Sequence, residues 1–360
     1  MRIAQIAPLW IPIPPRTYGG IELMVFNLVE ELKKRGHEIV LYASGDSHAG
    51  VETKSVVEQA LWLQKQVRNP HAAIIRMLNQ IRQDVGAYDL IHNHFNFFMF
   101  PLANEPKAPP ILTTIHNPID QSLAETIKQF PNLHFCVLSE DERKSAEEFG
   151  IATDGVVPNG IEIEKYTFNP KMGDYLLYLG RLNREKGIAT ALSVAKKSNT
   201  KIVVAGNIVG AEEWTYFMHE VQPNLNEENV KFVGQVDFAE KIKLLSNAKA
   251  LLFPIDRREP FGLVMIEAMA CGTPVIAFGK GSVPEIVENG KNGFVVNTED
   301  EMVQMVDKIG FINREHCRKA VEEKYTIKHM TDKYEEIYQK ILKKNKNFSS
   351  IERSLSSSKA

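Results

Sequence analysis

RIAQIA (residues 2–7), IELMVFNLVEELKKR (21–35) and HEIVLY (37–42) follow one another near the start of the chain. The first and third segments are short apolar runs, which are typical of buried parallel strands. The middle segment has apolar residues at helical spacing and is followed by Gly36, a residue type that commonly ends a helix. Strand, helix and strand in this order predict a βαβ unit and therefore a parallel sheet.

The same alternation continues along the chain in two series. The first series predicts further core strands at residues 89–92, 111–115 and 134–138. After a loop-like stretch, the second series predicts strands at residues 175–180, 201–206, 230–233, 250–253, 273–277 and 293–296. We therefore expect an α/β protein with two doubly wound domains, whose ligands bind at the carboxyl ends of the strands.

The expected domain boundaries follow from the pause between the two series. We expect a first domain over residues 1–168 and a second over 169–328, with a charged amphipathic helix over 329–345 that packs back on the first domain. Residues 346–360 are rich in Ser and Lys and poor in apolar residues, so we expect them to be disordered. The segment 52–86 matches no recognisable pattern, and its role stays open.

Composition restricts the class of protein. The formal net charge of −2 does not suggest a nucleic-acid-binding protein. The few cysteines, Cys136, Cys271 and Cys317, are widely spaced, so they predict neither disulfides nor a zinc site and fit a reducing cytosol. No signal peptide and no run of ~20 apolar residues is apparent, so we expect a soluble cytoplasmic protein. The apolar cluster at residues 61–63 leaves open a peripheral contact with the inner face of the membrane.

The stretch EPFGLVMIEAMACGTP (residues 259–274) carries the strongest chemical signal. It follows a predicted strand and enters a helix, whose N-terminal backbone amides predict a diphosphate site. The amides concerned are those of Phe261, Gly262 and Leu263. Glu259 and Glu267 can face one side, where ionised carboxylates would be strong acceptors for sugar hydroxyls. A plain helix with an acidic start is the alternative.

The stretch GRLNREKG (residues 180–187) follows another predicted strand. Arg181 and Lys186 can both reach one diphosphate, Arg as a planar fork and Lys as a point charge. A solvated basic loop is the alternative.

Further candidate residues follow strands of the first series. Gly19 and Gly20 let the backbone approach a ligand closely, but they do not form the G-x-G-x-x-G fingerprint of a dinucleotide site. Glu22 flanks this glycine pair. His116 follows a strand, which favours a place in the ligand site. The pair His92 and His94 also follows a strand, but no third metal ligand is apparent, so a structural or acceptor-site role is favoured.

The stretch at residues 259–274 resembles the signature of retaining glycosyltransferases of family 4, E-P-F-G-x-x-x-x-E-A-x-A-x-G-x-P-V, and every fixed position is matched. This resemblance implies the GT-B fold, in which two Rossmann-like domains face each other across a cleft. It also implies that Glu259 contacts the transferred sugar, that Glu267 binds the ribose, and that Arg181 and Lys186 neutralise the leaving diphosphate.

The resemblance extends over most of the chain and adds further roles. Gly19 and Gly20 correspond to the glycine loop that touches donor phosphate and acceptor, and His116 lies where the family places a His near the donor sugar. Val233 and Gly234 correspond to the strand end that holds the nucleobase through its backbone. The catalytic residues implied in this way are Glu259, His116, Arg181 and Lys186.

We therefore expect a retaining glycosyltransferase that moves a hexose from a UDP- or GDP-sugar to a hydroxyl of a glycan, lipid-linked or small-molecule acceptor. The chain contains no Asp-x-Asp motif, so we expect neither a metal ion nor another cofactor. A nucleotide-sugar epimerase, a phosphorylase and a non-catalytic nucleotide-sugar-binding protein are the alternatives. The first would need further acid–base carboxylates and the second a pyridoxal-bearing lysine, and neither is identified.

Overall fold

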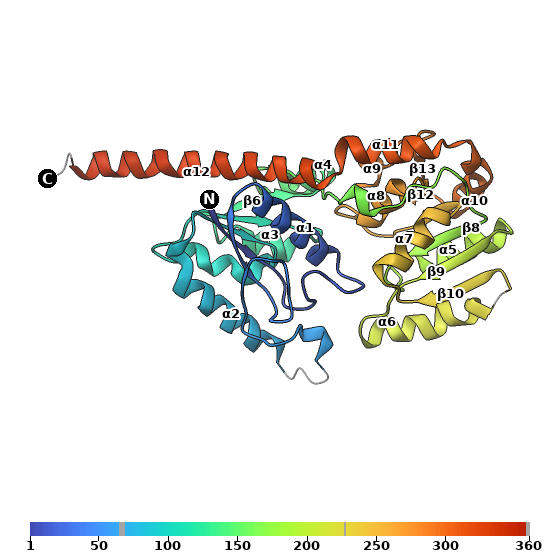
Figure 1. Cartoon of the computed structure of the whole chain (residues 1–360), viewed down its shortest axis with the longest axis horizontal. Helices are drawn as coiled ribbons and strands as arrows, with labels where there is room; N and C mark the ends of the chain where they lie inside the picture. The colour runs from blue at the N-terminus through green and yellow to red at the C-terminus, as the bar shows by residue number, and fades with distance from the viewer. Residues whose placement is uncertain (65–68, 227, 358–360) are drawn as a thin grey trace. The chain divides into compact units, whose positions relative to one another are not determined.

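The computed structural model describes residues 1–64, 69–226 and 228–357 and divides the chain into two compact units. Unit 1 comprises residues 1–15, 19–158 and 327–360, and unit 2 comprises residues 16–18 and 159–326. Each unit has its own parallel sheet with helices packed on it (Figure 1), which confirms the expected α/β class with two doubly wound domains.

The sheet of unit 1 has the strand order β3-β2-β1-β4-β5-β6-β7. In this order the strands are β3 (Glu52–Lys54), β2 (Glu38–Tyr42), β1 (Arg2–Ile6), β4 (Leu90–Asn93), β5 (Ile111–Thr114), β6 (His134–Val137) and β7 (Gly155–Val156). All are parallel to their neighbours, and the order changes direction between β1 and β4. Such a switch point opens a crevice at the carboxyl ends of the strands.

Two apolar cores are found in unit 1. One core contains side chains of helices α2 (Pro70–Asp84) and α3 (Gln121–Ile127) and of the short helix η3 (Asn96–Asn104). The other core contains side chains of α1 (Gly20–Lys34) and of the C-terminal helix α12 (Ile327–Ser357). The remaining described helices of unit 1 are η1 (Leu61–Leu63), η2 (Val85–Ala87) and α4 (Glu140–Glu148).

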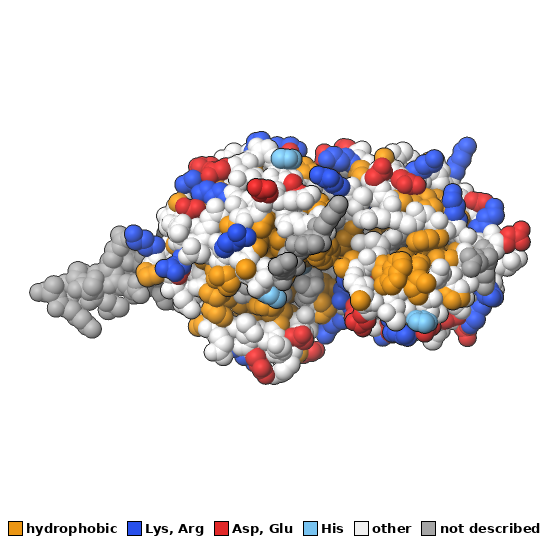
Figure 2. Space-filling model, turned by 90° about the horizontal axis from the view of Figure 1, so that it is seen from below, with side chains coloured by type: hydrophobic (Ala, Val, Ile, Leu, Met, Phe, Trp, Pro, Cys, Tyr) orange, Lys and Arg blue, Asp and Glu red, His pale blue; other side chains and the backbone are white. Residues whose placement is uncertain are grey.

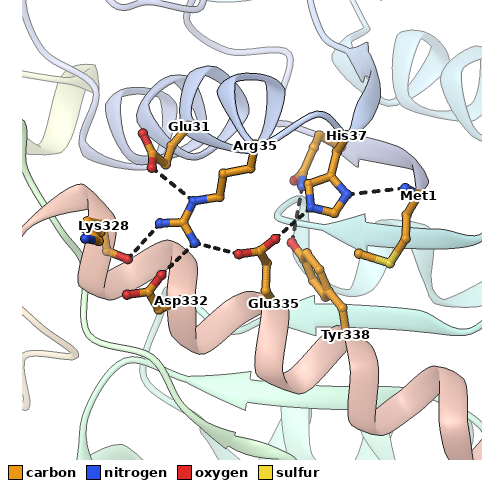
Figure 3. A network of polar contacts seen from close by, with 9 residues as sticks. Met1, Glu31, Arg35, His37, Lys328, Asp332, Glu335 and Tyr338 are labelled. Carbon is orange, nitrogen blue, oxygen red and sulfur yellow. Dashed lines mark hydrogen bonds and ion pairs between the residues drawn. The ribbon is translucent and has the colours of Figure 1, made fainter.

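Helix α12 is fixed to unit 1 by apolar and charged contacts. Tyr334 and Tyr338 are fully buried in the core that includes α1. Arg35, which follows α1, forms ion pairs with Asp332 at 2.6 Å and with Glu335 at 2.5 Å (Figure 3). His37 contacts the other oxygen of Glu335 at 2.7 Å.

Helix α12 is longer than the sequence analysis predicts. It continues to Ser357, whereas composition predicts disorder from residue 346, and residues 358–360 lie outside the described part of the chain. The helix can continue because no Gly or Pro lies between Ile327 and Ser357.

The sheet of unit 2 has the strand order β10-β9-β8-β11-β12-β13. In this order the strands are β10 (Val230–Gly234), β9 (Lys201–Ala205), β8 (Tyr175–Leu179), β11 (Ala250–Phe253), β12 (Val275–Phe278) and β13 (Gly293–Val296). The described helices of this unit are η4 (Ile163–Lys165), α5 (Ile188–Lys197), α6 (Gly210–Tyr216), η5 (Phe217–Val221), η6 (Gln222–Asn226), α7 (Phe238–Asn247), α8 (Leu263–Ala270), α9 (Val283–Ile286), α10 (Glu299–Lys308), η7 (Ile309–Phe311) and α11 (Arg314–Lys324).

The described helices include none that is both long and apolar enough to cross a membrane. Apolar side chains nevertheless reach the surface of both units (Figure 2). The most exposed large ones in unit 1 include Trp62 and Ile75, and those in unit 2 include Trp214 and Phe311.

Candidate active site

The two motifs of unit 2 follow adjacent central strands. Strand β8 leads into residues 180–187 and β11 leads into the loop before α8, and the two strands pair directly. The order of the sheet changes direction between these strands, so both loops lie at the switch point where open α/β sheets bind ligands.

Lys186 and Glu259 lie in contact at this point. Nζ of Lys186 is 2.6 Å from Oε2 of Glu259, and both side chains are largely buried. Gly187 brings their loops together, because a Cβ at this position would lie 1.9 Å from the carbonyl oxygen of Pro254. Its φ of +74° also belongs to the left-handed region that favours glycine. The structure therefore pairs two residues that sequence analysis assigns to the site separately.

Arg181 is paired with a residue that the sequence analysis missed. Its guanidinium forms an ion pair with Glu213, in the first turn of α6. Glu213 also accepts a hydrogen bond from Asn183 Nδ2 at 2.9 Å and one from the Val209 amide at 2.7 Å. Asn183 in turn accepts from the Lys186 amide at 3.0 Å, so a continuous polar network joins Arg181 to Lys186.

Glu267 is held by two side chains that the motif does not contain. Its Oε1 accepts a hydrogen bond from the Tyr166 hydroxyl at 2.8 Å and lies 2.6 Å from Nζ of Lys241. Tyr166 precedes the first strand of unit 2 and Lys241 lies on α7. Only their residue types hint at a role, since neither is part of a recognisable pattern.

The first backbone amides of α8 are available to donate hydrogen bonds to a ligand. Its N-cap is Gly262, with a φ of +80° and no side chain to bond the first amides. Among the described residues, the amides of Phe261, Gly262 and Leu263 donate no hydrogen bond to another backbone group. Free amides at a helix N-terminus form a site for an anion.

The loop at residues 281–282 shapes this turn. The Ser282 amide donates to the carbonyl oxygen of Glu259, and the Ser282 hydroxyl donates to that of Phe261, each at 2.9 Å. A Cβ on Gly281 would lie 2.3 Å from the carbonyl oxygen of Glu259, so glycine is required for this approach. Phe261 is buried and packs edge-on against Tyr325.

Val233 and Gly234 lie at the carboxyl end of β10. The carbonyl oxygen of Gly234 accepts a hydrogen bond from the Gly206 amide at 2.8 Å, and Gly234 has a φ of +70°. The pair thus lies at the same sheet edge as the loops that follow β8 and β9.

In unit 1, Gly19 and Gly20 form the start of α1 at the carboxyl end of β1. A Cβ on Gly19 would lie 2.8 Å from that of Pro15 and 3.0 Å from Oε2 of Glu22, so this turn admits only glycine. Glu22 is buried beside the turn, and burial raises its pKa to about 7.

The three candidate histidines of unit 1 lie in contact. Nε2 of His116 is 3.1 Å from Nδ1 of His94, and His92 packs against His94 with ring centroids 3.9 Å apart. Burial lowers the pKa of all three, that of His116 to about 3. No group of three or more His, Cys, Asp or Glu that could hold a metal ion is found in the described part of the chain.

Comparison with known families gives two adjacent matches. The model described as Glycosyltransferase Family 4 matches residues 18–165, and the model described as Glycosyl transferases group 1 matches residues 161–326.

Curated relatives extend these matches. The chain is 24% identical to a phosphatidyl-myo-inositol mannosyltransferase of Mycolicibacterium smegmatis, covering 88% of this chain and 86% of the relative. It is 33% identical to an uncharacterised 41.2 kDa protein in the cps region of Klebsiella pneumoniae. That second match covers 50% of this chain and 48% of the relative, and so spans about half the length of each.

A solved structure supports the same fold. An Anabaena protein in complex with UDP and glucose superposes with a TM-score of 0.77. The match covers 94% of this chain and 100% of that protein, at 16% identity.

Proposed function

Because this chain belongs to family 4 of the GT-B glycosyltransferases, we propose that it transfers a hexose from a UDP- or GDP-sugar to an acceptor hydroxyl with retention of the anomeric configuration. The observation that carries this proposal is the polar network from Glu259 through Lys186 and Asn183 to Glu213 and Arg181. It joins two cations and two carboxylates at the switch point of the sheet, where helix α8 begins.

The diphosphate of the donor binds to Arg181, Lys186 and the amides at the start of α8. In this structure both cations form ion pairs with carboxylates, so the diphosphate competes with Glu213 for Arg181 and with Glu259 for Lys186. Lys186 can contact phosphate and Glu259 together, since an ammonium group has three donors. Glu259 then accepts hydrogen bonds from hydroxyls of the sugar.

Glu267 binds the ribose of the nucleotide. Lys241 and Tyr166 both contact its Oε1, which leaves Oε2 to accept from the ribose hydroxyls. A buried carboxylate held in this way loses little conformational freedom when the nucleotide binds. Val233 and Gly234 contact the base through their backbone.

The reaction breaks the bond between C1 of the sugar and the diphosphate oxygen. Negative charge grows on the leaving oxygen as this bond lengthens, and Arg181, Lys186 and the α8 amides stabilise it more than they stabilise the ground state. The acceptor oxygen forms its bond to C1 on the face that the diphosphate leaves. The hydroxyl proton passes to the departing phosphate oxygen, so no protein nucleophile is needed.

We propose that protein groups, without a metal ion, stabilise the negative charge that develops on the leaving diphosphate. The side chains of Arg181 and Lys186 and the amides of Phe261, Gly262 and Leu263 supply positive charge and hydrogen-bond donors where a cation would otherwise act. Activity should then be unchanged in excess EDTA, and a loss restored by magnesium or manganese would contradict this part of the proposal.

The substrate classes are inferred from similar proteins. The Anabaena protein has been solved with UDP-glucose, and the mycolicibacterial relative is named for transfer of mannose to phosphatidyl-myo-inositol. We propose a UDP- or GDP-hexose donor and a glycan, lipid-linked or small-molecule acceptor. His116 contacts a hydroxyl of the transferred sugar, and Gly19 and Gly20 lie beside the donor phosphate and the acceptor.

A lipid-linked acceptor would fit a cytoplasmic protein that contacts the inner face of the membrane. The exposed side chains of Trp62 and Leu63 in η1 and of Ile75 in α2 support this placement, because aromatic and aliphatic side chains insert into the headgroup region. Sedimentation with anionic liposomes tests it. Wild type should pellet with the vesicles and a Trp62→Ser, Ile75→Ser variant should not, whereas equal behaviour of the two would contradict the contact.

The central experiment measures thermal stability and product release in parallel. UDP, GDP, ADP and NAD are added to wild type, to Glu267→Gln and to the control Glu335→Gln, which alters an ion-paired glutamate of unit 1. One nucleoside diphosphate should raise the melting temperature of wild type and of the control, since a ligand at 100 times its Kd adds about 2.7 kcal/mol. Glu267→Gln should lose that shift.

Transfer itself is measured by release of the same nucleoside diphosphate from its hexose conjugate. Release by wild type that Lys186→Met abolishes supports a transferase. Binding without any release would favour a non-catalytic nucleotide-sugar-binding protein, and stabilisation only by NAD would overturn the proposal.

A further inference from the structure

Gln5 lies in the centre of a buried polar network in unit 1. Its side chain leaves β1 fully buried, with Oε1 2.9 Å from Nε2 of His94 and Nε2 3.4 Å from the hydroxyl of Tyr338. The primary amide thus connects two branches. One leads through His94 to His116, and the other leads through Tyr338 of α12 to His92.

With the Gln5 amide oriented as in the structure, the first branch determines which nitrogen of His116 carries a proton. Burial lowers the pKa of both His94 and His116, so each ring is neutral and has one N–H and one lone pair. The amide oxygen of Gln5 can only accept, so Nε2 of His94 donates to it. Nδ1 of His94 then carries the lone pair and must accept a hydrogen bond from Nε2–H of His116, 3.1 Å away.

The second branch has a matching direction. Nε2 of Gln5 donates to the hydroxyl of Tyr338, which leaves that hydroxyl free to donate to Nδ1 of His92 at 2.6 Å. Nε2–H of His92 then donates to Oγ1 of Thr114 at 2.7 Å. Each hydrogen bond of the two branches therefore joins one donor to one acceptor when the Gln5 amide has this orientation.

The end of the first branch is the part that a substrate can reach. His116 is half-buried, whereas His94 and Gln5 are buried. Among the described residues, Nδ1 of His116 has no hydrogen-bond partner. The direction of the network leaves a lone pair on that atom.

We propose that Gln5 and Tyr338 are positioning residues for His116, which they hold through His94 as the Nε2–H tautomer, so that Nδ1 accepts a hydrogen bond from a hydroxyl of the transferred sugar. The inference rests on the proposed function for the identity of the ligand, but the tautomer is a property of the free protein. Tyr338 acts from the C-terminal helix, 246 residues from His92 in the chain (Figure 3 shows its position on α12).

Tyr338 holds the amide in this orientation when its hydroxyl donates its own proton to Nδ1 of His92, because it can then only accept from Nε2 of Gln5. A phenylalanine at this position would leave that buried amide N–H without its partner, and a 180° rotation of the amide would bring an N–H group to His94 instead. His94 would then donate from Nδ1 to His116, and His116 would carry its proton on Nδ1. In Tyr338→Phe, His116 should therefore no longer be held as the Nε2–H tautomer.

Nitrogen-15 NMR of the full-length protein with labelled histidine tests the inference directly, since ring nitrogen shifts distinguish the two neutral tautomers. The His116 signals are assigned by their loss in His116→Gln. In the free wild type, His116 should be the Nε2–H tautomer at neutral pH. A dominant Nδ1–H form in wild type would overturn the inference, whether or not the protein transfers sugars.

The matched control is Tyr334→Phe. Tyr334 is also fully buried on α12 and stacks on Tyr338, but its hydroxyl contacts Thr114 at 3.1 Å, beyond His92 on the second branch. Tyr338→Phe should give a mixture of His116 tautomers, whereas Tyr334→Phe should keep the wild-type form. Equal spectra for the two variants would refute the role of Tyr338.

Activity gives the second measurement. We expect Tyr338→Phe to lower kcat about tenfold, which corresponds to ~1.4 kcal/mol in the activation free energy, with little change in the KM for the donor. Tyr334→Phe should lower the melting temperature about as much as Tyr338→Phe does, but it should keep the wild-type kcat. If Tyr338→Phe fails to fold, Gln5→Met is the second variant. It replaces the amide of Gln5 by an apolar side chain of similar length and should give the same mixture of His116 tautomers.

Failure of the inference and failure of the proposed function are distinguishable. A fixed Nε2–H tautomer in a protein that binds no nucleoside diphosphate would leave the network correct and the function wrong. Sugar transfer by a protein whose His116 carries its proton on Nδ1 would leave the function correct and the inference wrong.

Discussion

The hydroxyl of Tyr166 donates a 2.8 Å hydrogen bond to Oε1 of Glu267, although the two residues are 101 positions apart in the chain. The ammonium group of Lys241 lies 2.6 Å from the same oxygen. One carboxylate oxygen is thus fixed by two donors from different elements, and the other is left for a ligand. Glu267 is therefore held in one orientation, in which its second carboxylate oxygen can accept a hydrogen bond from a ligand.

Replacement of Tyr166 by Phe should therefore weaken nucleotide binding. Loss of one hydrogen bond of about 1 kcal/mol should raise the Kd for the stabilising nucleoside diphosphate about fivefold. Calorimetric titration measures this change. Tyr175→Phe is the control, because its hydroxyl bonds the carbonyl oxygen of Leu244 at 2.8 Å and not a candidate site residue. Equal affinities of the two variants would contradict the role given to Tyr166.

Glu213→Gln should have the opposite effect on the nucleotide. Its carboxylate competes with a bound diphosphate for Arg181, and its negative charge opposes an anion nearby. Gln keeps one acceptor oxygen, which can accept from Asn183 or from the Val209 amide but not from both. With the negative charge removed, we expect the Kd to fall several-fold and its salt dependence to increase. The control Glu220→Gln alters an exposed glutamate 4.0 Å from Arg184. Weaker binding by Glu213→Gln would show that its charge positions Arg181 more than it competes.

Lys186→Met should lower both the catalytic rate and the thermal stability. The developing charge on the leaving phosphate loses a partner, so kcat should fall at least 100-fold, or about 2.7 kcal/mol in activation free energy. Glu259 is also left buried without its cation, so the melting temperature should fall. Lys280→Met, which removes an exposed lysine 3.8 Å from Asp256, should change neither quantity. Retention of wild-type kcat by Lys186→Met would exclude it from the reaction.

Glu22 should make stability depend on pH. Burial raises its pKa from 4.5 to about 7, so the folded state binds the proton more tightly than the unfolded state does. Its contribution is greatest below pH 4.5 and is lost as the pH rises to about 7, a change of about 3 kcal/mol at 1.36 kcal/mol per pKa unit.

Glu22→Gln removes this titration. Its melting temperature should exceed that of wild type at pH 8 and differ little from it at about pH 4.5, where both side chains are neutral. Scanning calorimetry at both values tests the expectation. A variant that is less stable than wild type at pH 8 would mean that the ionised carboxylate is favoured in the fold.

The fold could be predicted in large part because its signals are local. Most of the parallel strands are short apolar runs, as in Leu251 and Leu252 of β11. Two βα turns of unit 2 have glycine where the backbone requires it, at Gly187 and Gly262. The loops that follow β8 and β11 could likewise be found from contiguous motifs. These two loops lie side by side because β8 and β11 are neighbours in the sheet. The alternation of strands and helices in the sequence already limits the possible strand orders.

The partners of the site residues could not be predicted, because their contacts join distant segments. In the sequence, nothing distinguishes Glu213, Lys241 and Tyr166 from ordinary surface or linker residues. The fold brings Glu213 to Arg181, and it brings Lys241 and Tyr166 to Glu267. Tyr338 is a further case, since periodicity shows only that it lies on a helix face. The roles of Glu259, Glu267, Arg181, Lys186 and His116 themselves stay predictions that the variants above test.

Helix α12 also has a consequence for the order in which the protein is made. Its buried tyrosines complete a core of unit 1 whose other side chains include those of β1, α1 and β2, which the ribosome synthesises first. Residues 159–326 leave the ribosome before α12 and contain nearly all of unit 2. The second unit can therefore acquire its native structure during translation before the first, whose core keeps one apolar face uncovered until α12 is synthesised. Nascent chains that stop before Ile327 would expose that face to chaperones.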